Sequence, residues 1–100
     1  MKMEADYVRE AKKVFDKEIE ALRKTKEVLD DTFAEIVRAI MSCKGKVILC
    51  GMGKSGHIAK KISATMSSLG TSSFYLHPGE AMHGDLGMVT DADLVILISH

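Results

Sequence analysis

The chain has 100 residues, of which 46% are hydrophobic and 28% are charged. This composition suits one small globular unit and excludes a disordered or collagen-like chain. Fourteen basic residues balance fourteen acidic ones, so the sequence offers no net positive field to attract nucleic acid or an anionic membrane. We therefore expect neither a nucleic-acid partner nor a membrane partner.

The N-terminus and the two cysteines both indicate a soluble, cytoplasmic protein. The first ten residues are charged and lack the apolar stretch of a secretion signal, and no apolar run reaches membrane-spanning length. Cys43 and Cys50 are the only thiols, and Cys50 lies within an apolar run. Two reduced cysteines are expected, rather than a disulfide.

The first 43 residues predict two helices. From about residue 5 to residue 29, apolar side chains recur every seven positions, at Val8, Phe15, Leu22 and Leu29. Such a narrow apolar stripe needs a helical partner, which is either the second helix or another subunit. The second helix is predicted from Thr32 to about Cys43, because Thr32 followed by Glu35 resembles a capping box.

The remaining residues predict a parallel α/β sheet. A continuous apolar run at 47–50 is typical of a buried strand. A helix should follow the glycines and end at Gly70, since apolar residues recur there at helical spacing. Further strands are predicted at 73–76 and 94–98, and residues 77–90 are expected to be mostly loop, with room for a helical turn. Strands that alternate with a helix and a long connection favour parallel pairing.

The glycine-rich segment 46–57, KVILCGMGKSGH, suggests a phosphate site. A Walker A loop would need a glycine at position 48, where the sequence has Ile48. Gly51, Gly53 and Gly56 match the G-x-G-x-x-G of dinucleotide sites, but the second strand does not end in an acidic residue. Glycines before a helix still favour a small bound anion, and Lys54 and Ser55 add a positive charge and a hydroxyl.

A second informative segment, HPGEAMHGDLG at 77–87, follows the end of a predicted strand. It holds His77 and His83 together with Glu80 and Asp85, and ligands of open α/β sheets bind at that edge. His57, near the start of a predicted helix, is expected to pack or to cap it. His77, His83 and the two thiols are the available ligands for a divalent metal such as zinc, but zinc-finger spacing is absent, and we expect no required cofactor.

Together, GMGKSGH and HPGEAMHGDLGM resemble the sugar isomerase (SIS) domain of bacterial D-arabinose-5-phosphate isomerases. The resemblance covers about residues 43–99. It implies that residues 44–100 are the N-terminal part of a Rossmann-like three-layer αβα domain, preceded by a helical segment at 1–43 that packs on this domain or on a partner subunit. It also implies interconversion of D-ribulose 5-phosphate and D-arabinose 5-phosphate, which supplies the lipopolysaccharide or capsule sugar Kdo. The alternatives are a non-catalytic regulatory SIS module that binds a phosphosugar and, less favoured, a dinucleotide-binding oxidoreductase.

The resemblance also assigns roles to individual residues. Lys54 matches the catalytically important lysine of the family, and His77 matches a histidine that contacts substrate and can also bind metal. The substrate-binding candidates, including two from the glycine turn, are Gly53, Ser55, Gly70, Thr71, His77, His83 and Ser99.

The end of the sequence departs from the family pattern. The family continues from the position of Ser99 into its main phosphate-binding loop, and His100 takes the place of an asparagine. The downstream catalytic glutamates, a histidine and later strands of the family have no counterpart within the 100 residues. We therefore expect a truncated domain with an apolar strand at an exposed edge, inactive on its own and self-associating, and a homotetramer in the full-length protein.

Overall fold

A computed structural model describes residues 3–99 of the chain. The chain divides into two compact units, Met1–Glu35 and Ile36–His100. The predicted assignment of 1–43 and 44–100 as separate segments stays a prediction. Within the described residues, no helix combines the length and the apolar character needed to cross a membrane.

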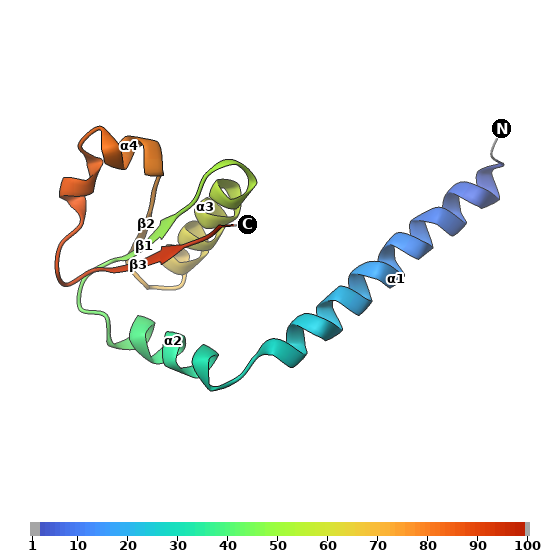
Figure 1. The fold of residues 1–100 in the computed structure, drawn as a ribbon, viewed down its shortest axis with the longest axis horizontal. Helices are drawn as coiled ribbons and strands as arrows, with labels where there is room; N and C mark the ends of the chain where they lie inside the picture. Colours follow the sequence, from blue (N-terminus) through green and yellow to red (C-terminus); the bar gives the residue numbers. More distant parts are fainter. Residues whose placement is uncertain (1–2, 100) are drawn as a thin grey trace. The chain divides into compact units, whose positions relative to one another are not determined.

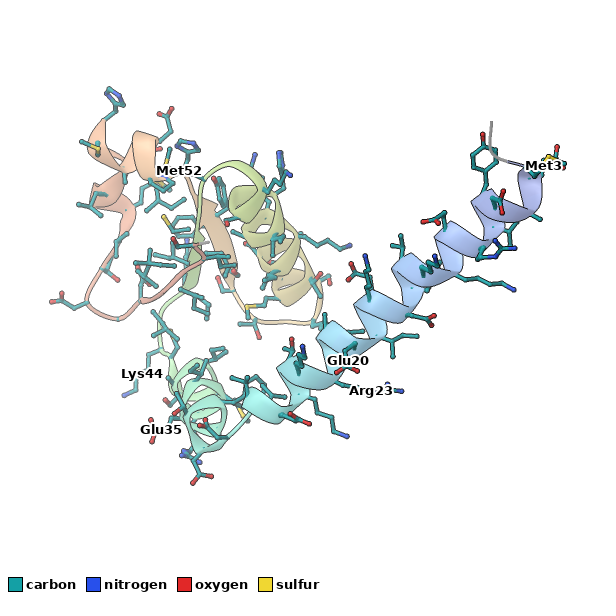
Figure 2. All side chains as sticks on the ribbon, turned by 45° about the vertical axis from the view of Figure 1, so that its right-hand side comes forward. Met3, Glu20, Arg23, Glu35, Lys44 and Met52 are labelled. Carbon is teal, nitrogen blue, oxygen red and sulfur yellow. The ribbon has the colours of Figure 1, made fainter. Side chains whose placement is uncertain are left out.

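Helix α1 (Glu4–Val28) begins and ends within one residue of the predicted helix (Figure 1). None of its residues is buried, and Phe15 and Leu22 of the predicted stripe are 70% and 68% exposed. Acidic and basic side chains three residues apart pair along the surface, as Glu20 and Arg23 do at 3.7 Å (Figure 2). Such exposed pairs contribute only about 0.3–0.5 kcal/mol each. The stripe is thus available to a partner, whose identity stays a prediction.

Helix α2 (Asp31–Ser42) starts one residue earlier than predicted, because its cap differs from the predicted one. The Asp30 carboxylate accepts a hydrogen bond from the backbone N–H of Thr32 at 2.9 Å. Asp30 therefore satisfies one of the free N–H groups of the first turn, and Thr32 already lies inside the helix. The prediction that Thr32 and Glu35 form the capping box was wrong. Asp30, two positions before Thr32, is an equally good cap.

Three parallel strands form the sheet at the centre of the second unit. They are β1 (Val47–Cys50), β2 (Ser73–Leu76) and β3 (Leu94–Leu97), in the order β2-β1-β3. Leu49 of β1 pairs with Tyr75 on one side and with Ile96 on the other. Every residue of β1 is buried, as its continuous apolar sequence predicted. The parallel sheet is confirmed.

Helix α3 (Gly53–Ser68) connects β1 to β2 and covers one face of the sheet (Figure 1). Val47, Leu49 and Ala59 form the buried core between them, and Ile40 and Ile62 pack against it. Gly70 has a φ of 98°, a conformation that L-residues with side chains rarely adopt, and the helix ends just before it. The helix stop predicted from this glycine is confirmed.

Strand β3 lies at an edge of the sheet. Val95 and Leu97, which alternate with half-buried residues, are 41% and 73% exposed. The predicted exposed apolar edge is therefore confirmed, and it is a surface that favours association.

The connection between β2 and β3 contains more helix than predicted. Helix α4 (Pro78–Met82) and the 3-10 helix η1 (Asp85–Met88) occupy most of it. Pro78 stands in the first turn, where its missing N–H costs nothing, and the His77 side chain accepts a hydrogen bond from the backbone N–H of Gly79. The glycines favoured a loop prediction, but this N-terminal signal decides the local structure.

Asp93 ties together the two loops that lead into β1 and β3. Its carboxylate accepts hydrogen bonds from the backbone N–H groups of Lys46 at 2.7 Å and Thr90 at 2.8 Å. The hydrogen bond from Lys46, followed by that from Thr90, lowers the pKa of the Asp93 carboxyl. A carboxyl with a lowered folded-state pKa stabilises the fold above its unfolded-state pKa, and this contribution is lost as pH falls through the folded-state pKa.

We therefore expect Asp93→Asn to lower the melting temperature at pH 7, because an amide cannot accept both hydrogen bonds as a carboxylate does. The difference from the wild type should shrink as the pH falls below the ordinary pKa of an aspartate. Thermal denaturation followed by circular dichroism between pH 7 and pH 3 measures both. Asp91→Asn, on the same loop with an exposed side chain, is the control. A difference that does not change with pH would contradict the role of the carboxylate.

Candidate functional site

The carboxyl end of β1 leads into the start of α3 through the glycine turn. Gly53 has a φ of 58°, which glycine tolerates without strain. Met52, the residue before the helix, gives no side-chain cap, and the first helical hydrogen bond of the turn is donated by the Gly56 N–H to the Met52 carbonyl at 3.1 Å. The first N–H groups of α3 are thus left without helical partners, and they favour a bound anion at this end. Lys54 is the second residue of this helix.

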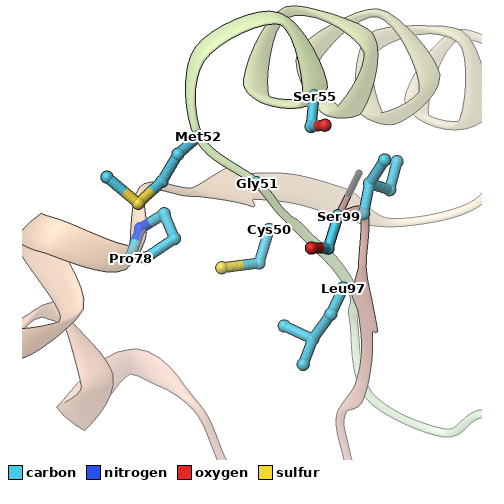
Figure 3. A pocket seen from close by; sticks show the side chains of 8 residues that line it. Cys50, Gly51, Met52, Ser55, Pro78, Leu97 and Ser99 are labelled. Carbon is cyan, nitrogen blue, oxygen red and sulfur yellow. The ribbon is translucent and has the colours of Figure 1, made fainter.

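A pocket of about 450 Å³ opens at this edge of the sheet (Figure 3). In Figure 3, Met52 and Pro78 lie on one side, Leu97 and Ser99 lie on the other, and Ser55 projects from α3. Ser55 and Ser99, two predicted substrate-binding residues, therefore line the same pocket although 44 positions separate them in the sequence. The lining residues are Cys50, Gly51, Met52, Ser55, Pro78, Leu97, Ile98 and Ser99. Mostly apolar walls with two hydroxyls suit a small polar ligand held by a few directed hydrogen bonds.

A second pocket of about 220 Å³ lies between α3 and the end of β2. It brings together Gly53 and His77, which the sequence predicted as substrate-binding. The lining residues are Gly53, Gly56, His57, Lys60, Tyr75 and His77. His57 is exposed and lines this pocket, so the prediction that it packs in the protein or caps a helix was wrong. His57 lies on the exposed face of α3, and the sequence alone did not show which face of this helix is exposed.

His77 has one ring nitrogen already engaged. Its Nδ1 accepts a hydrogen bond from the Gly79 N–H at 2.9 Å. The neutral ring therefore carries its proton on Nε2, which can donate a hydrogen bond to a ligand oxygen.

A metal ligand would instead need an unprotonated nitrogen and further donors. Across residues 3–99, no group of three or more His, Cys, Asp or Glu side chains is placed to hold a metal ion. These residues therefore do not fit a complete metal site, and metal binding by His77 stays a prediction that depends on ligands from elsewhere. Both cysteines have free thiols.

The other predicted site residues are spread more widely. Lys54 and His83 are exposed, and His83 is the C-cap residue that follows α4. Gly70 and Thr71 precede β2 and line a third pocket of about 260 Å³ beside the start of β1. This pocket lies at the amino ends of the strands, whereas Lys54 lies beyond their carboxyl ends. The four residues of β1, a length of about 13 Å, separate the two. One chain therefore does not bring Lys54 and Thr71 together, and His100 lies outside the described residues.

Sequence reasoning missed Tyr75 and Lys60 as residues that line the second pocket. His57 and Lys60 are three positions apart on one helix, a spacing that places both on one face. That spacing was a usable signal. Tyr75 reaches the pocket only because β2 pairs with β1, and no pattern in the neighbouring residues indicates this.

Comparison with known proteins places this geometry in a family. The SIS domain model matches residues 40–100. Arabinose 5-phosphate isomerase KpsF of Escherichia coli O6:H1 (strain CFT073) is 58% identical over 80 residues, which are 79% of this chain and 24% of that protein. Arabinose 5-phosphate isomerase KdsD of Salmonella typhimurium is 48% identical over 95 residues, which are 95% of this chain and 29% of that protein.

A solved structure agrees with these relatives. The E. coli CFT073 protein c3406, solved in complex with A5P, is 42% identical in sequence and superposes with a TM-score of 0.92. The match covers 99% of this chain and 53% of that one. The chain thus spans about a quarter of the curated relatives and about half of the solved chain. A family model that matches 61 of the 100 residues, from 40 to 100, and a superposition at this level lead to one conclusion: the chain belongs to the SIS domain family.

Proposed function

We propose that the protein to which this chain belongs is an aldose–ketose isomerase that interconverts D-ribulose 5-phosphate and D-arabinose 5-phosphate, and so supplies the precursor of Kdo. One observation carries this proposal. The glycine turn at residues 51–53 and the start of the histidine loop, at His77 and Pro78, both border pockets at the carboxyl ends of the strands. Both segments belong to a chain whose relatives are named arabinose 5-phosphate isomerases.

The proposed chemistry moves a proton between adjacent carbons through an enediol. A base removes the proton from the carbon beside the carbonyl, the carbonyl oxygen gains negative charge, and a proton then moves between the two oxygens before carbon is reprotonated. The Lys54 ammonium group and the free N–H groups of α3 supply positive charge for that oxygen. The Nε2–H of His77 can donate a hydrogen bond to a sugar oxygen. The resemblance places the base downstream of residue 100.

Assembly is part of the same proposal. The exposed stripe of α1, with Phe15 70% exposed, and the exposed Leu97 on β3 are apolar surfaces that a second copy would cover. A cytoplasmic homotetramer agrees with the family resemblance. By itself the 100-residue chain should self-associate but lack turnover, because the resemblance puts the base and the main phosphate loop beyond it.

The function is tested on the full-length protein with two measurements. We expect conversion of D-ribulose 5-phosphate to D-arabinose 5-phosphate, and heat of binding in calorimetry with D-arabinose 5-phosphate but not with NAD. Phosphosugar binding without turnover would instead support the regulatory module. Binding of NAD alone would contradict the proposal and favour an oxidoreductase.

A further inference from the structure

Tyr75 connects strand β2 to the glycine turn. Its hydroxyl donates a half-buried hydrogen bond of 2.6 Å to the carbonyl oxygen of Gly51. The two residues are 24 positions apart, and Gly51, which is buried, is the first residue after β1. A buried carbonyl needs such a partner, because leaving it unpaired is costly.

Gly56 leaves the space that this hydrogen bond needs. A Cβ atom at position 56 would lie 3.0 Å from the Tyr75 hydroxyl oxygen and 2.8 Å from the Gly51 carbonyl oxygen. Both distances are too short for a real side chain to adopt without displacing its neighbours. The third glycine of G-x-G-x-x-G thus allows the hydroxyl and the turn to meet, which accounts for it without a dinucleotide.

The Tyr75 ring also contacts two other parts of the second pocket. Lys60 Nζ lies 5.1 Å from the ring centroid, within cation–π range. The ring of His77 meets it edge-on, with centroids 6.4 Å apart and planes at 75°. One side chain therefore touches the glycine turn, helix α3 and the histidine that begins the second site segment.

We infer that Tyr75 is a positioning residue: its hydroxyl holds the Gly51 carbonyl and so fixes the turn that presents Lys54 and Ser55. This inference rests on the proposed isomerase function. Lys54 is three residues after Gly51, so a turn released at Gly51 would move the ammonium group relative to the developing oxyanion. Small displacements of a catalytic charge lower turnover more than they weaken substrate binding.

Tyr75→Phe in the full-length protein tests this inference, because it removes only the hydroxyl and keeps the ring. We expect kcat to fall about tenfold with KM changed by less than about twofold. Tyr7→Phe, on the exposed surface of α1, is the matched control and should leave both unchanged. A kcat for Tyr75→Phe equal to that of the control would overturn the inference.

A double-mutant cycle separates positioning from a general structural role. If Tyr75 acts through Lys54, adding Tyr75→Phe to Lys54→Met should lower the residual kcat no further. The same factor in both backgrounds would mean that Tyr75 acts by another route.

Amide hydrogen exchange tests the hydrogen bond even if the full-length protein proves to have no isomerase activity, which would refute the proposed function alone. The Gly56 amide, which donates to the Met52 carbonyl across this turn, should exchange faster in Tyr75→Phe than in the wild type and in Tyr7→Phe. Unchanged exchange of the Gly56 amide would overturn the positioning role.

Discussion

Replacing Lys54 by methionine in the full-length protein should lower kcat for D-ribulose 5-phosphate at least about a hundredfold, a loss expected when a positioned donor to an oxyanion is removed. Methionine keeps much of the length and flexibility of the lysine side chain and removes its charge. Because Lys54 is exposed and lies in the first turn of α3, the fold should be retained, with a melting temperature close to that of the wild type. Steady-state kinetics and thermal denaturation measure both.

Lys61→Met is the matched control for this experiment. Lys61 is also an exposed lysine of α3, but it lies two turns further along, away from the start of the helix. Its loss should change kcat by less than about twofold, since surface charges far from a site contribute little. Near-normal turnover of Lys54→Met would contradict a catalytic role for Lys54.

Mixing two inactive variants should restore isomerase activity. Lys54 and Thr71 stand at opposite edges of one sheet, yet the family resemblance gives both a role toward the same substrate. These two facts agree if the active site takes Lys54 from one subunit and Thr71 from another. Lys54→Met and Thr71→Ala should then each be impaired alone. An equimolar mixture, unfolded and refolded together, should regain about a quarter of the wild-type activity, because random assembly leaves that share of sites with both side chains intact.

Two controls make this result specific. Each variant refolded alone should stay impaired, which excludes recovery through refolding itself. A single chain that carries both substitutions, refolded with an equal amount of wild type, shows how far one inactive copy lowers the activity of its neighbours. Activity of the mixture no greater than the average of the two variants would place both residues in the site of one subunit, or deny Thr71 a role.

The elements that sequence predicted best are those whose residues act locally. The run from Val47 to Cys50 is buried on both sides and therefore apolar at every position, so its bounds were predicted to the residue. Gly70 stops α3 because of its own φ preference. The start of α2 was missed because Asp30 and Thr32 are both good caps, and only the observed hydrogen bond from the Thr32 N–H to the Asp30 carboxylate distinguishes them.

The site depends on contacts between distant segments, and only part of it could be predicted from the sequence. The shared edge of Ser55 and Ser99 follows from parallel strands, since every carboxyl end points the same way. The separation of Thr71 from Lys54 follows from the same topology and could have been deduced. The contact of the Tyr75 hydroxyl with Gly51 could not, because it depends on strand register and on the space left at Gly56.

Because no residue of α1 is buried, the folded fraction of this helix should depend on the concentration of a partner. A helix of 25 residues that buries nothing gains only its backbone hydrogen bonds and a few weak surface pairs, which barely offset the entropy of ordering it. Any partner that covers the stripe stabilises it by an amount that grows with the logarithm of the partner's concentration. If that partner is a second copy, dilution would unwind α1 while leaving the sheet with its buried Leu49 intact, so the same molecule would lose helix content without losing its core.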